Sequence, residues 1–188
     1  MHIQQAQENM NRLVVISGCS GGGKSTLLAE LKRRGYTVVE EPGRRVVSEE
    51  LKRGGQALPW IDMAAFLRNV IQLSITDWTR AGTANEWIFF DRGVVDAAAS
   101  LEHITGKPYL KRYGISLRYH HKVFLTPPWA EIYAEDPERR HSFDAALAEY
   151  GLLVTAYPAL DYDILAIPKT NVADRATFVL DALSGNGE

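Results

Sequence analysis

One segment, residues 18–25, constrains the fold of this chain more than any other stretch. Its sequence, GCSGGGKS, matches the pattern G-x-x-x-x-G-K-[ST] at every fixed position. The run 13–16 before it is apolar and β-branched, which is typical of a buried parallel strand. Residues 26–34 after it have helical apolar spacing and end at Gly35, a favoured C-cap residue. A turn without a ligand is the alternative, but a strand and a helix on the two sides favour a phosphate-binding loop.

The residue types of this loop suit a nucleoside triphosphate. Glycines let the chain turn tightly and aim successive N–H groups at phosphate oxygens, and the helix that follows adds its positive dipole end. Lys24 is expected to be exposed at the loop–helix junction and to reach the β- and γ-phosphates, while the Ser25 hydroxyl is a predicted Mg²⁺ ligand. The predicted nucleotide-binding residues here are Gly18, Ser20, Gly21, Gly22, Gly23, Lys24, Ser25 and Thr26.

Length and composition indicate one ordinary globular domain. The chain has 188 residues, of which 46% are hydrophobic and 23% charged. We expect a flexible lead-in over 1–11, a single domain over 12–184 and a tail over 185–188. The net charge of -2 argues against nucleic-acid binding, which needs a concentrated basic surface. Cys19 is the single cysteine, and no apolar run resembles a signal peptide or a membrane span, so we expect a cytoplasmic protein. The sequence indicates no oligomeric state.

Strand and helix patterns alternate along the rest of the chain. This alternation predicts an α/β fold of the P-loop NTPase class, a doubly wound five-stranded parallel sheet with helices on both faces. The expected further strands are 36–40, 87–91, 122–125 and 163–167, and the expected further helices are 44–52, 63–79, 94–103, 109–119, 143–157 and 172–183.

The carboxyl ends of the strands are where such sheets bind ligands. Asp91 follows four apolar residues, as in a Walker B strand that delivers a carboxylate beside magnesium; a helix N-cap is its alternative role. Arg92 is next to it and suits a phosphate or a substrate oxygen. At the second strand end, Glu41 is the candidate general base, and Glu40 replaces it if strand alternation turns Glu41 away. A solvated pair of carboxylates is the other possibility.

A charged segment, about 129–142, follows the fourth predicted strand. Its paired arginines, Arg139 and Arg140, are suited to neutralise charge that develops on a transferred phosphoryl group. We therefore predict a short arginine-bearing lid that closes over the nucleotide. A solvated loop with weak local ion pairs is the alternative.

Five stretches together resemble a family of P-loop proteins: GCSGGGKST, EEPGRR, FFDRG, DPERRHSF and IPKTNVADRATFVL. They are similar to the AAA_28 group of small P-loop ATPase- and kinase-like proteins, which is related to nicotinamide riboside kinases and to GTP-binding regulators of traffic. Glu41-Pro42 and Asp91-Arg92 also resemble motifs of deoxynucleoside kinases, in which the glutamate is the base. The resemblance implies a P-loop kinase with Lys169 near the nucleotide base. No Asn-Lys-x-Asp guanine signature is present, which favours ATP over GTP.

Three functions follow from these residues. The first is an ATP- and Mg²⁺-dependent phosphotransferase that acts on a small hydroxyl or phosphate acceptor, with nucleoside-like molecules among the candidates. The second is a nucleotide-dependent switch, an ATPase or GTPase that signals to a protein or lipid partner. The third is a kinase whose target is a macromolecule, as in a toxin. The identity of the acceptor does not follow from the sequence.

Overall fold

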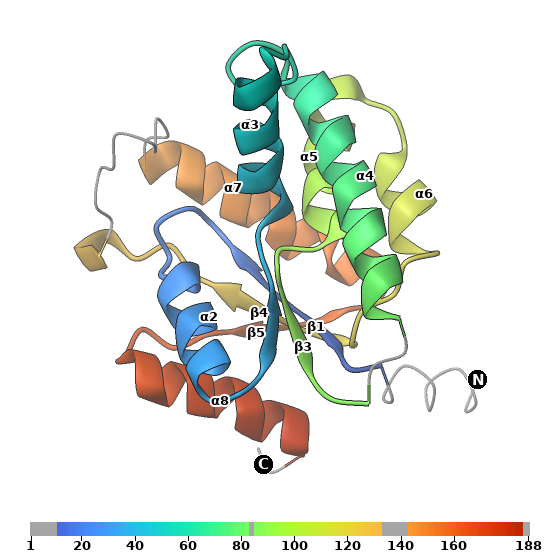
Figure 1. Ribbon diagram of the computed structural model, residues 1–188. Helices are drawn as coiled ribbons and strands as arrows, with labels where there is room; N and C mark the ends of the chain where they lie inside the picture. Colours follow the sequence, from blue (N-terminus) through green and yellow to red (C-terminus); the bar gives the residue numbers. More distant parts are fainter. Residues whose placement is uncertain (1–10, 83–84, 133–142, 186–188) are drawn as a thin grey trace.

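A parallel sheet of five strands forms the centre of the structure, a computed structural model that describes residues 11–82, 85–132 and 143–185 (Figure 1). The spatial order of the strands is β2-β3-β1-β4-β5, and every neighbouring pair is parallel. The fold class that the alternating pattern predicts is therefore confirmed. The strands are β1 (Leu13–Gly18), β2 (Thr37–Val39), β3 (Ile88–Asp91), β4 (Lys122–Thr126) and β5 (Asp163–Ala166).

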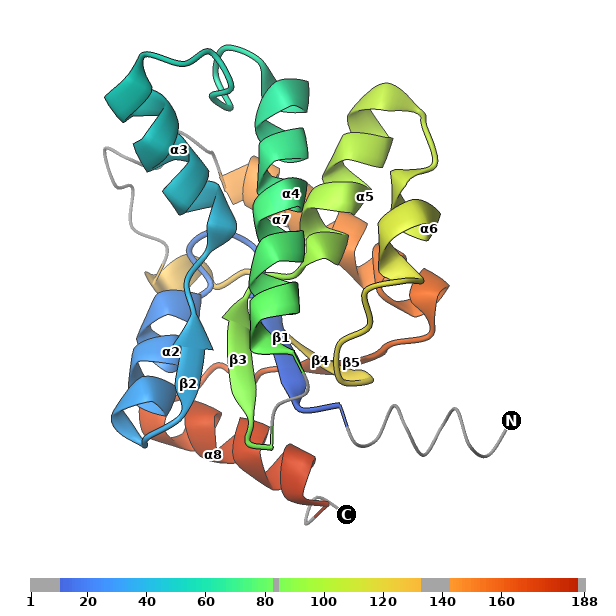
Figure 2. The same ribbon diagram turned by 45° about the vertical axis from the view of Figure 1, so that its right-hand side comes forward.

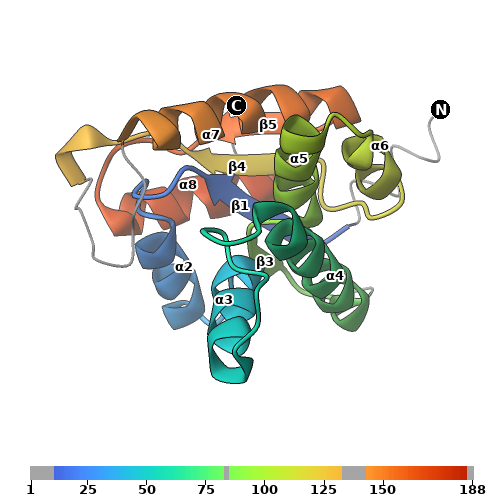
Figure 3. The same ribbon diagram turned by 90° about the horizontal axis from the view of Figure 1, so that it is seen from above.

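Helices cover both faces of the sheet (Figures 1 and 3). One face carries α2 (Lys24–Arg33) and α8 (Val172–Ser184), which pack against each other. The other face carries α4 (Met63–Ala81), α5 (Val94–Thr105) and α7 (Phe143–Ala156). None of the helices in the described ranges is long and apolar enough to cross a bilayer. The remaining elements are α3 (Pro42–Arg53), α6 (Tyr109–Gly114) and the 3-10 turns η1 (Ala130–Ile132) and η2 (Pro158–Leu160).

The helix predicted over 109–119 is shorter in the structure, because α6 ends at Gly114. A Cβ at this position would lie 2.2 Å from the Leu160 side chain, so the helix passes too close to η2 for a larger residue. Beyond it, the backbone N–H of Tyr119 donates to the Tyr162 hydroxyl, and that of His120 donates to the Leu13 carbonyl. These partners belong to other elements, and they draw the chain into the sheet instead of continuing the helix.

The central strand β1 is buried along its whole length. Val14 and Ile16 face the core beneath α2 and α8, while Leu13 and Val15 face the core beneath the larger helical layer. This alternation follows from the two-residue period of a strand, and a parallel strand covered on both faces reads as a continuous apolar run. The pattern that marked β1 in the sequence thus reflects two separate cores.

The strand order brings the predicted functional residues to one edge of the sheet. β1 lies between β3 and β4, with Ile16 paired to Asp91 and Gly18 paired to Thr126. The chain leaves β1 towards β2 on one side and later continues to β4 on the other, so β1 is the point where the order reverses. Ligands of doubly wound sheets bind in the crevice outside the strands at such a point. In Figure 2 the same edge lies between the ends of α2, α3 and α7.

Candidate functional site

The predicted phosphate loop lies between β1 and α2, as expected. Gly18 has φ +122°, and a Cβ there would lie 2.3 Å from the Thr126 carbonyl oxygen, so only glycine fits against β4. Gly23 precedes α2 with φ +74°, in the left-handed region that glycine adopts without strain. Ser25 and Thr26 are exposed in the first turn of α2. The loop therefore presents the positive end of a ten-residue helix to the edge of the sheet.

Lys24 is buried, with 7% of its surface exposed, which corrects the expectation of an exposed lysine. Its side chain folds back over the loop, and Nζ donates to the carbonyl oxygens of Gly18 at 3.3 Å and Cys19 at 2.9 Å. Burial and the nearby Arg92 guanidinium lower the pKa of Lys24. The Cys19 thiol is also buried, and burial raises its pKa, so this residue fills space in the loop and is not an activated thiolate.

Asp91 ends β3 with 8% of its surface exposed. It is not a helix cap, because α5 begins at Val94 after a capping Gly93. Its Oδ1 atom is buried and has no hydrogen-bond partner within the described ranges. Burial and the Glu41 carboxylate raise the pKa of Asp91 to about 6, although Lys24 and Arg92 act in the opposite direction. A carboxylate oxygen that lacks a partner and carries unfavourable negative charge suits a hard cation.

The raised pKa makes a testable prediction for Asp91→Asn. Between the ordinary pKa of 3.8 and the folded-state value of about 6, the folded protein binds the proton more tightly, so stability falls as the pH rises through 6. At pH 8 in EDTA the substitution removes this penalty and should raise the free energy of unfolding by about 3 kcal/mol. At pH 4 the gain should vanish. Urea unfolding at both pH values measures this difference in the free energy of unfolding, with Glu49→Gln at an exposed position as the control. An Asp91→Asn protein that is less stable than the wild type at pH 8 would contradict the prediction.

Arg92 is the centre of the charge cluster at this edge. Its backbone has φ +68°, a left-handed conformation that is uncommon for a non-glycine residue and costs it energy. The guanidinium pairs with Glu149 at 2.8 Å, Asp96 at 3.3 Å and Glu41 at 3.4 Å. Burial acts to lower the pKa of Arg92, but the three carboxylates outweigh it and the net shift is upward. The side chain therefore stays charged.

The structure distinguishes the two carboxylates that follow β2. Glu40 is exposed, whereas Glu41 turns inward at the start of α3, where Arg44 Nε lies 2.9 Å from Oε2 and Arg92 contacts Oε1. Burial acts to raise the pKa of Glu41, but Arg92 and Lys24 lower it more. Glu41 is thus ionised and faces the same space as Lys24 and Asp91.

Glu149 is a site residue that the sequence reading did not identify. It comes from α7, and its Oε2 accepts a hydrogen bond from the Ser20 backbone N–H at 3.1 Å while Oε1 pairs with Arg92. A carboxylate thus contacts the phosphate loop where the fold favours an anion. No signal in the sequence marks it, because a glutamate on an amphipathic helix usually lies on a solvated face.

Asp96 is a second residue that was not among the predicted site residues. It is buried in the first turn of α5, where it accepts hydrogen bonds from the Tyr157 hydroxyl at 2.5 Å, the Gly93 N–H at 3.0 Å and the Ser17 hydroxyl. With Arg92 as a further donor, this carboxylate holds the guanidinium against the sheet edge. A usable signal was the aspartate in the first turn of the predicted helix 94–103, a position that favours an acidic residue.

The other predicted site residues are less constrained. Lys169 is exposed on the loop between β5 and α8. Arg139 and Arg140 lie outside the described residues, as does most of the predicted lid. Within the described ranges no group of three or more His, Cys, Asp or Glu side chains is arranged to hold a metal. Mg²⁺ bound with a nucleotide needs only one or two protein ligands, and the Asp91 carboxylate and the Ser25 hydroxyl supply these donor types.

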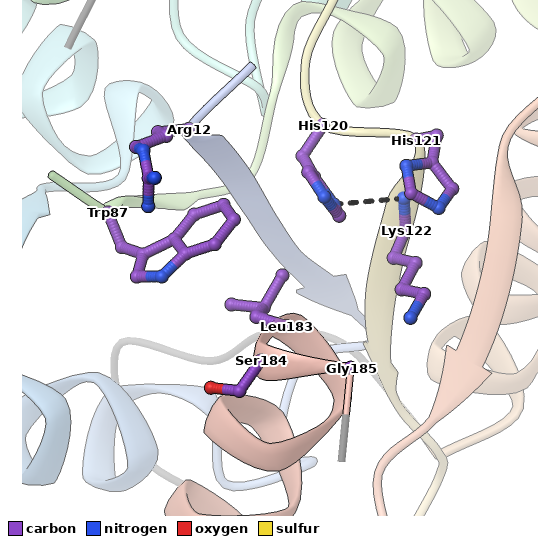
Figure 4. Close-up of a pocket in the computed structure, with 8 residues that line it drawn as sticks. All are labelled: Arg12, Trp87, His120, His121, Lys122, Leu183, Ser184 and Gly185. Carbon is purple, nitrogen blue, oxygen red and sulfur yellow. Dashed lines mark hydrogen bonds between the residues drawn. The ribbon is translucent and has the colours of Figure 1, made fainter. Parts of the chain in front are cut away.

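A pocket of about 590 Å³ lies at the opposite end of the sheet, at the amino ends of β1, β3 and β4 (Figure 4). In it the Arg12 guanidinium lies 4.8 Å from the centre of the Trp87 ring. Lys122 Nζ already donates to the Ala182 carbonyl at 2.7 Å, and burial lowers the pKa of His120 to about 4, which leaves it uncharged at neutral pH. This pocket is remote from the phosphate loop and takes no part in the site.

Among the solved structures with a similar fold are two kinases. The deoxyadenosine kinase from M. mycoides, with dCMP and dCDP bound, superposes with a TM-score of 0.66 over 92% of this chain and 99% of that one, at 14% identity. The same enzyme with dATP gives a TM-score of 0.56 at 13% identity over the same shares of the two chains. The shikimate kinase from Acinetobacter baumannii, in complex with shikimate, gives 0.54 at 16% identity, over 97% and 98% of the two chains. At this identity the likeness shows the fold.

Sequence comparison identifies the family. A search of curated proteins finds no significant match. The family model AAA_28, described as an AAA domain, matches residues 13–175, from the start of β1 into α8. That span contains the phosphate loop, Glu41, Asp91, Arg92 and Glu149, and it confirms the resemblance on which the sequence interpretation drew. The chain therefore belongs to the AAA_28 family and has the fold of P-loop kinases.

Proposed function

We propose that this protein is an ATP- and Mg²⁺-dependent phosphotransferase whose acceptor is a small molecule with a hydroxyl group, such as a nucleoside. The observation that carries the proposal is the position of Glu41. This ionised carboxylate lies beside Arg92 and within electrostatic reach of Lys24, at the strand edge where the phosphate loop ends. A nucleotide switch needs no carboxylate there, whereas a kinase needs one to accept the proton of the attacking hydroxyl.

The phosphate side of the site belongs to the loop and α2. The backbone N–H groups of the loop and the Lys24 ammonium would bind the triphosphate, with Lys24 exchanging its loop carbonyls for phosphate oxygens. Asp91 and Ser25 would hold Mg²⁺, which supplies neutralising charge when it is bound with the nucleotide. Lys169 remains the predicted contact to the base.

The acceptor side belongs to Glu41, Arg92 and the predicted lid. Glu41 would take the proton of the acceptor hydroxyl, and Arg92 would stabilise charge on the transferred group from a position held by Asp96. Arg139 and Arg140 are proposed to add positive charge when the lid closes. Glu149, which pairs with Arg92, would have to yield to the incoming anionic phosphate or bind a hydroxyl of the acceptor.

The choice of acceptor rests on two similar folds. One belongs to an enzyme that acts on deoxyadenosine and the other to an enzyme crystallised with shikimate. Both molecules are small and carry free hydroxyl groups, and the site here offers carboxylates to bind such groups. Nucleosides and small polyhydroxylated acids are therefore the first acceptors to test.

A transfer assay tests the proposal directly. The protein is incubated with Mg²⁺, ATP labelled at the γ-phosphate and a panel of nucleosides and hydroxy acids. We expect slow hydrolysis of ATP alone and a labelled product with one acceptor class, because a kinase excludes water until its acceptor arrives. Hydrolysis that no small molecule stimulates, together with capture of a protein or lipid partner only in the ATP or only in the ADP state, would instead favour the switch.

A further inference from the structure

A buried arginine of the last helix, α8, contacts the predicted phosphate loop on the side that faces this helix. Arg175 lies in the first turn of α8 and has 3% of its surface exposed. Its Nη2 donates to the Gly22 carbonyl at 3.0 Å and its Nη1 to the Gly23 carbonyl at 3.3 Å. A Cβ on Gly23 would lie 2.7 Å from Nη1, so the glycine is needed for this contact.

The two carbonyl groups determine where the neighbouring amides point. In a trans peptide unit the C=O and the N–H of the next residue lie in one plane and point in opposite directions. An arginine that holds the Gly22 carbonyl therefore orients the Gly23 N–H, and one that holds the Gly23 carbonyl orients the Lys24 N–H. These two N–H groups belong to the part of the loop that is predicted to bind phosphate.

A contribution to folding stability does not explain why Arg175 is buried here. No carboxylate within the described ranges pairs with Arg175, its Nε is buried without a hydrogen-bond partner there, and burial lowers its pKa. Its guanidinium carbon lies 5.7 Å from the centre of the Trp129 ring. A buried cation without a counter-charge is unfavourable for folding. What this buried cation provides instead is a fixed geometry of the loop, through its bonds to the Gly22 and Gly23 carbonyls.

We infer that Arg175 is a positioning residue of the phosphate loop. It holds the Gly22 and Gly23 carbonyls on the α8 side, so that the amides of Gly23 and Lys24 point towards the triphosphate. The inference rests on the nucleotide-binding part of the proposed function and not on the transfer reaction. The sequence did carry a signal: Arg175 is a charged residue on the apolar face of α8, next to Ala176 and four residues before Val179, which are both buried.

Calorimetric titration with two probes tests this role. The probes are the Mg²⁺ complex of the non-hydrolysable imido analogue of ATP, and tripolyphosphate, which has no base or sugar. Arg175→Met, which keeps the aliphatic stem, should weaken the binding of both probes by the same factor, about tenfold or more. Arg175→Lys keeps a positive charge and N–H donors but replaces the forked guanidinium by a single nitrogen, so it should lose less affinity than Arg175→Met. The control is Arg34→Met, because Arg34 also links α2 to α8, through the Ala173 carbonyl and the Thr177 hydroxyl, but lies far from the loop.

Thermal unfolding of each variant separates positioning from structure. We expect Arg175→Met to unfold close to the wild-type temperature and to lose affinity all the same. Loss of affinity for the ATP analogue but not for tripolyphosphate would overturn the inference, because Arg175 would then contact the base or ribose. Unchanged affinity for both probes in Arg175→Met and Arg175→Lys would also overturn it. Wild-type protein that binds neither probe would contradict nucleotide binding itself, whereas binding without any phosphorylated acceptor would contradict only the kinase proposal.

Discussion

Lys24→Met is expected to weaken the binding of MgATP about 10- to 100-fold, the value of one strong charge-assisted hydrogen bond. Phosphoryl transfer should fall further, by about 100-fold or more, because the lost ammonium also stabilises charge that develops on the γ-phosphate. Methionine is the appropriate replacement, since the lysine is buried and alanine would leave a cavity. Isothermal titration measures the affinity, and labelled ATP measures transfer.

Lys32→Met is the matched control for this change. Lys32 lies on the same helix, α2, but is exposed and remote from the loop, so its replacement should alter neither quantity. The unfolding temperature of Lys24→Met should stay near that of the wild type, because the ammonium bonds only loop carbonyls and its burial is unfavourable. Unchanged affinity and turnover in Lys24→Met would refute the assignment of the phosphate loop.

Glu41→Gln is expected to reduce phosphoryl transfer by about 100-fold or more, the usual contribution of a general base. Glutamine keeps the size of the side chain and can still contact Arg92, but it cannot accept the proton of the acceptor. The affinity for MgATP should change little, because Glu41 is proposed to contact the acceptor and not the nucleotide. Single-turnover kinetics, with the acceptor found in the transfer assay, separates the chemical step from binding.

Glu40→Gln is a close control, one residue away on an exposed side chain, and should keep full activity. The pH dependence of kcat/KM adds a second criterion, since it reports groups of the free enzyme. If Glu41 is the base, the acidic limb should lie below the ordinary glutamate range, because Arg92 and Lys24 lower its pKa. A limb near pH 6 with full activity in Glu41→Gln would instead identify Asp91 as the base.

Much of the fold was accessible from the sequence because its signals are local. Each of the five strands is a short apolar run between turn residues, and each predicted helix is present near its expected bounds, apart from the early end of α6. The glycine-rich loop was equally clear, because its chemistry depends on residues that are adjacent in the chain. Asp91 and Arg92 could be assigned as a strand end for the same reason.

Distances across the fold could not be deduced in this way. The choice between Glu40 and Glu41 depends on how α3 leaves β2 and on the position of Arg92, which comes from β3. Glu149 reaches Ser20 across 129 residues of chain. The burial of Lys24 reflects the carbonyls of its own loop, which turn towards the side chain only in the folded conformation.

The sequence by itself determined the fold class, the family and the place of the glycine-rich loop between a strand and a helix, because strand and helix periodicity and the spacing of a contiguous motif are properties of neighbouring residues. The tertiary structure alone decided which charges meet. It placed Arg92 among Glu41, Asp96 and Glu149, left Asp91 with an unpartnered oxygen and a raised pKa, and brought Arg175 behind the loop. The physical reason is that electrostatic interaction and burial depend on distance in space, which the order of the strands sets and the order of the residues does not.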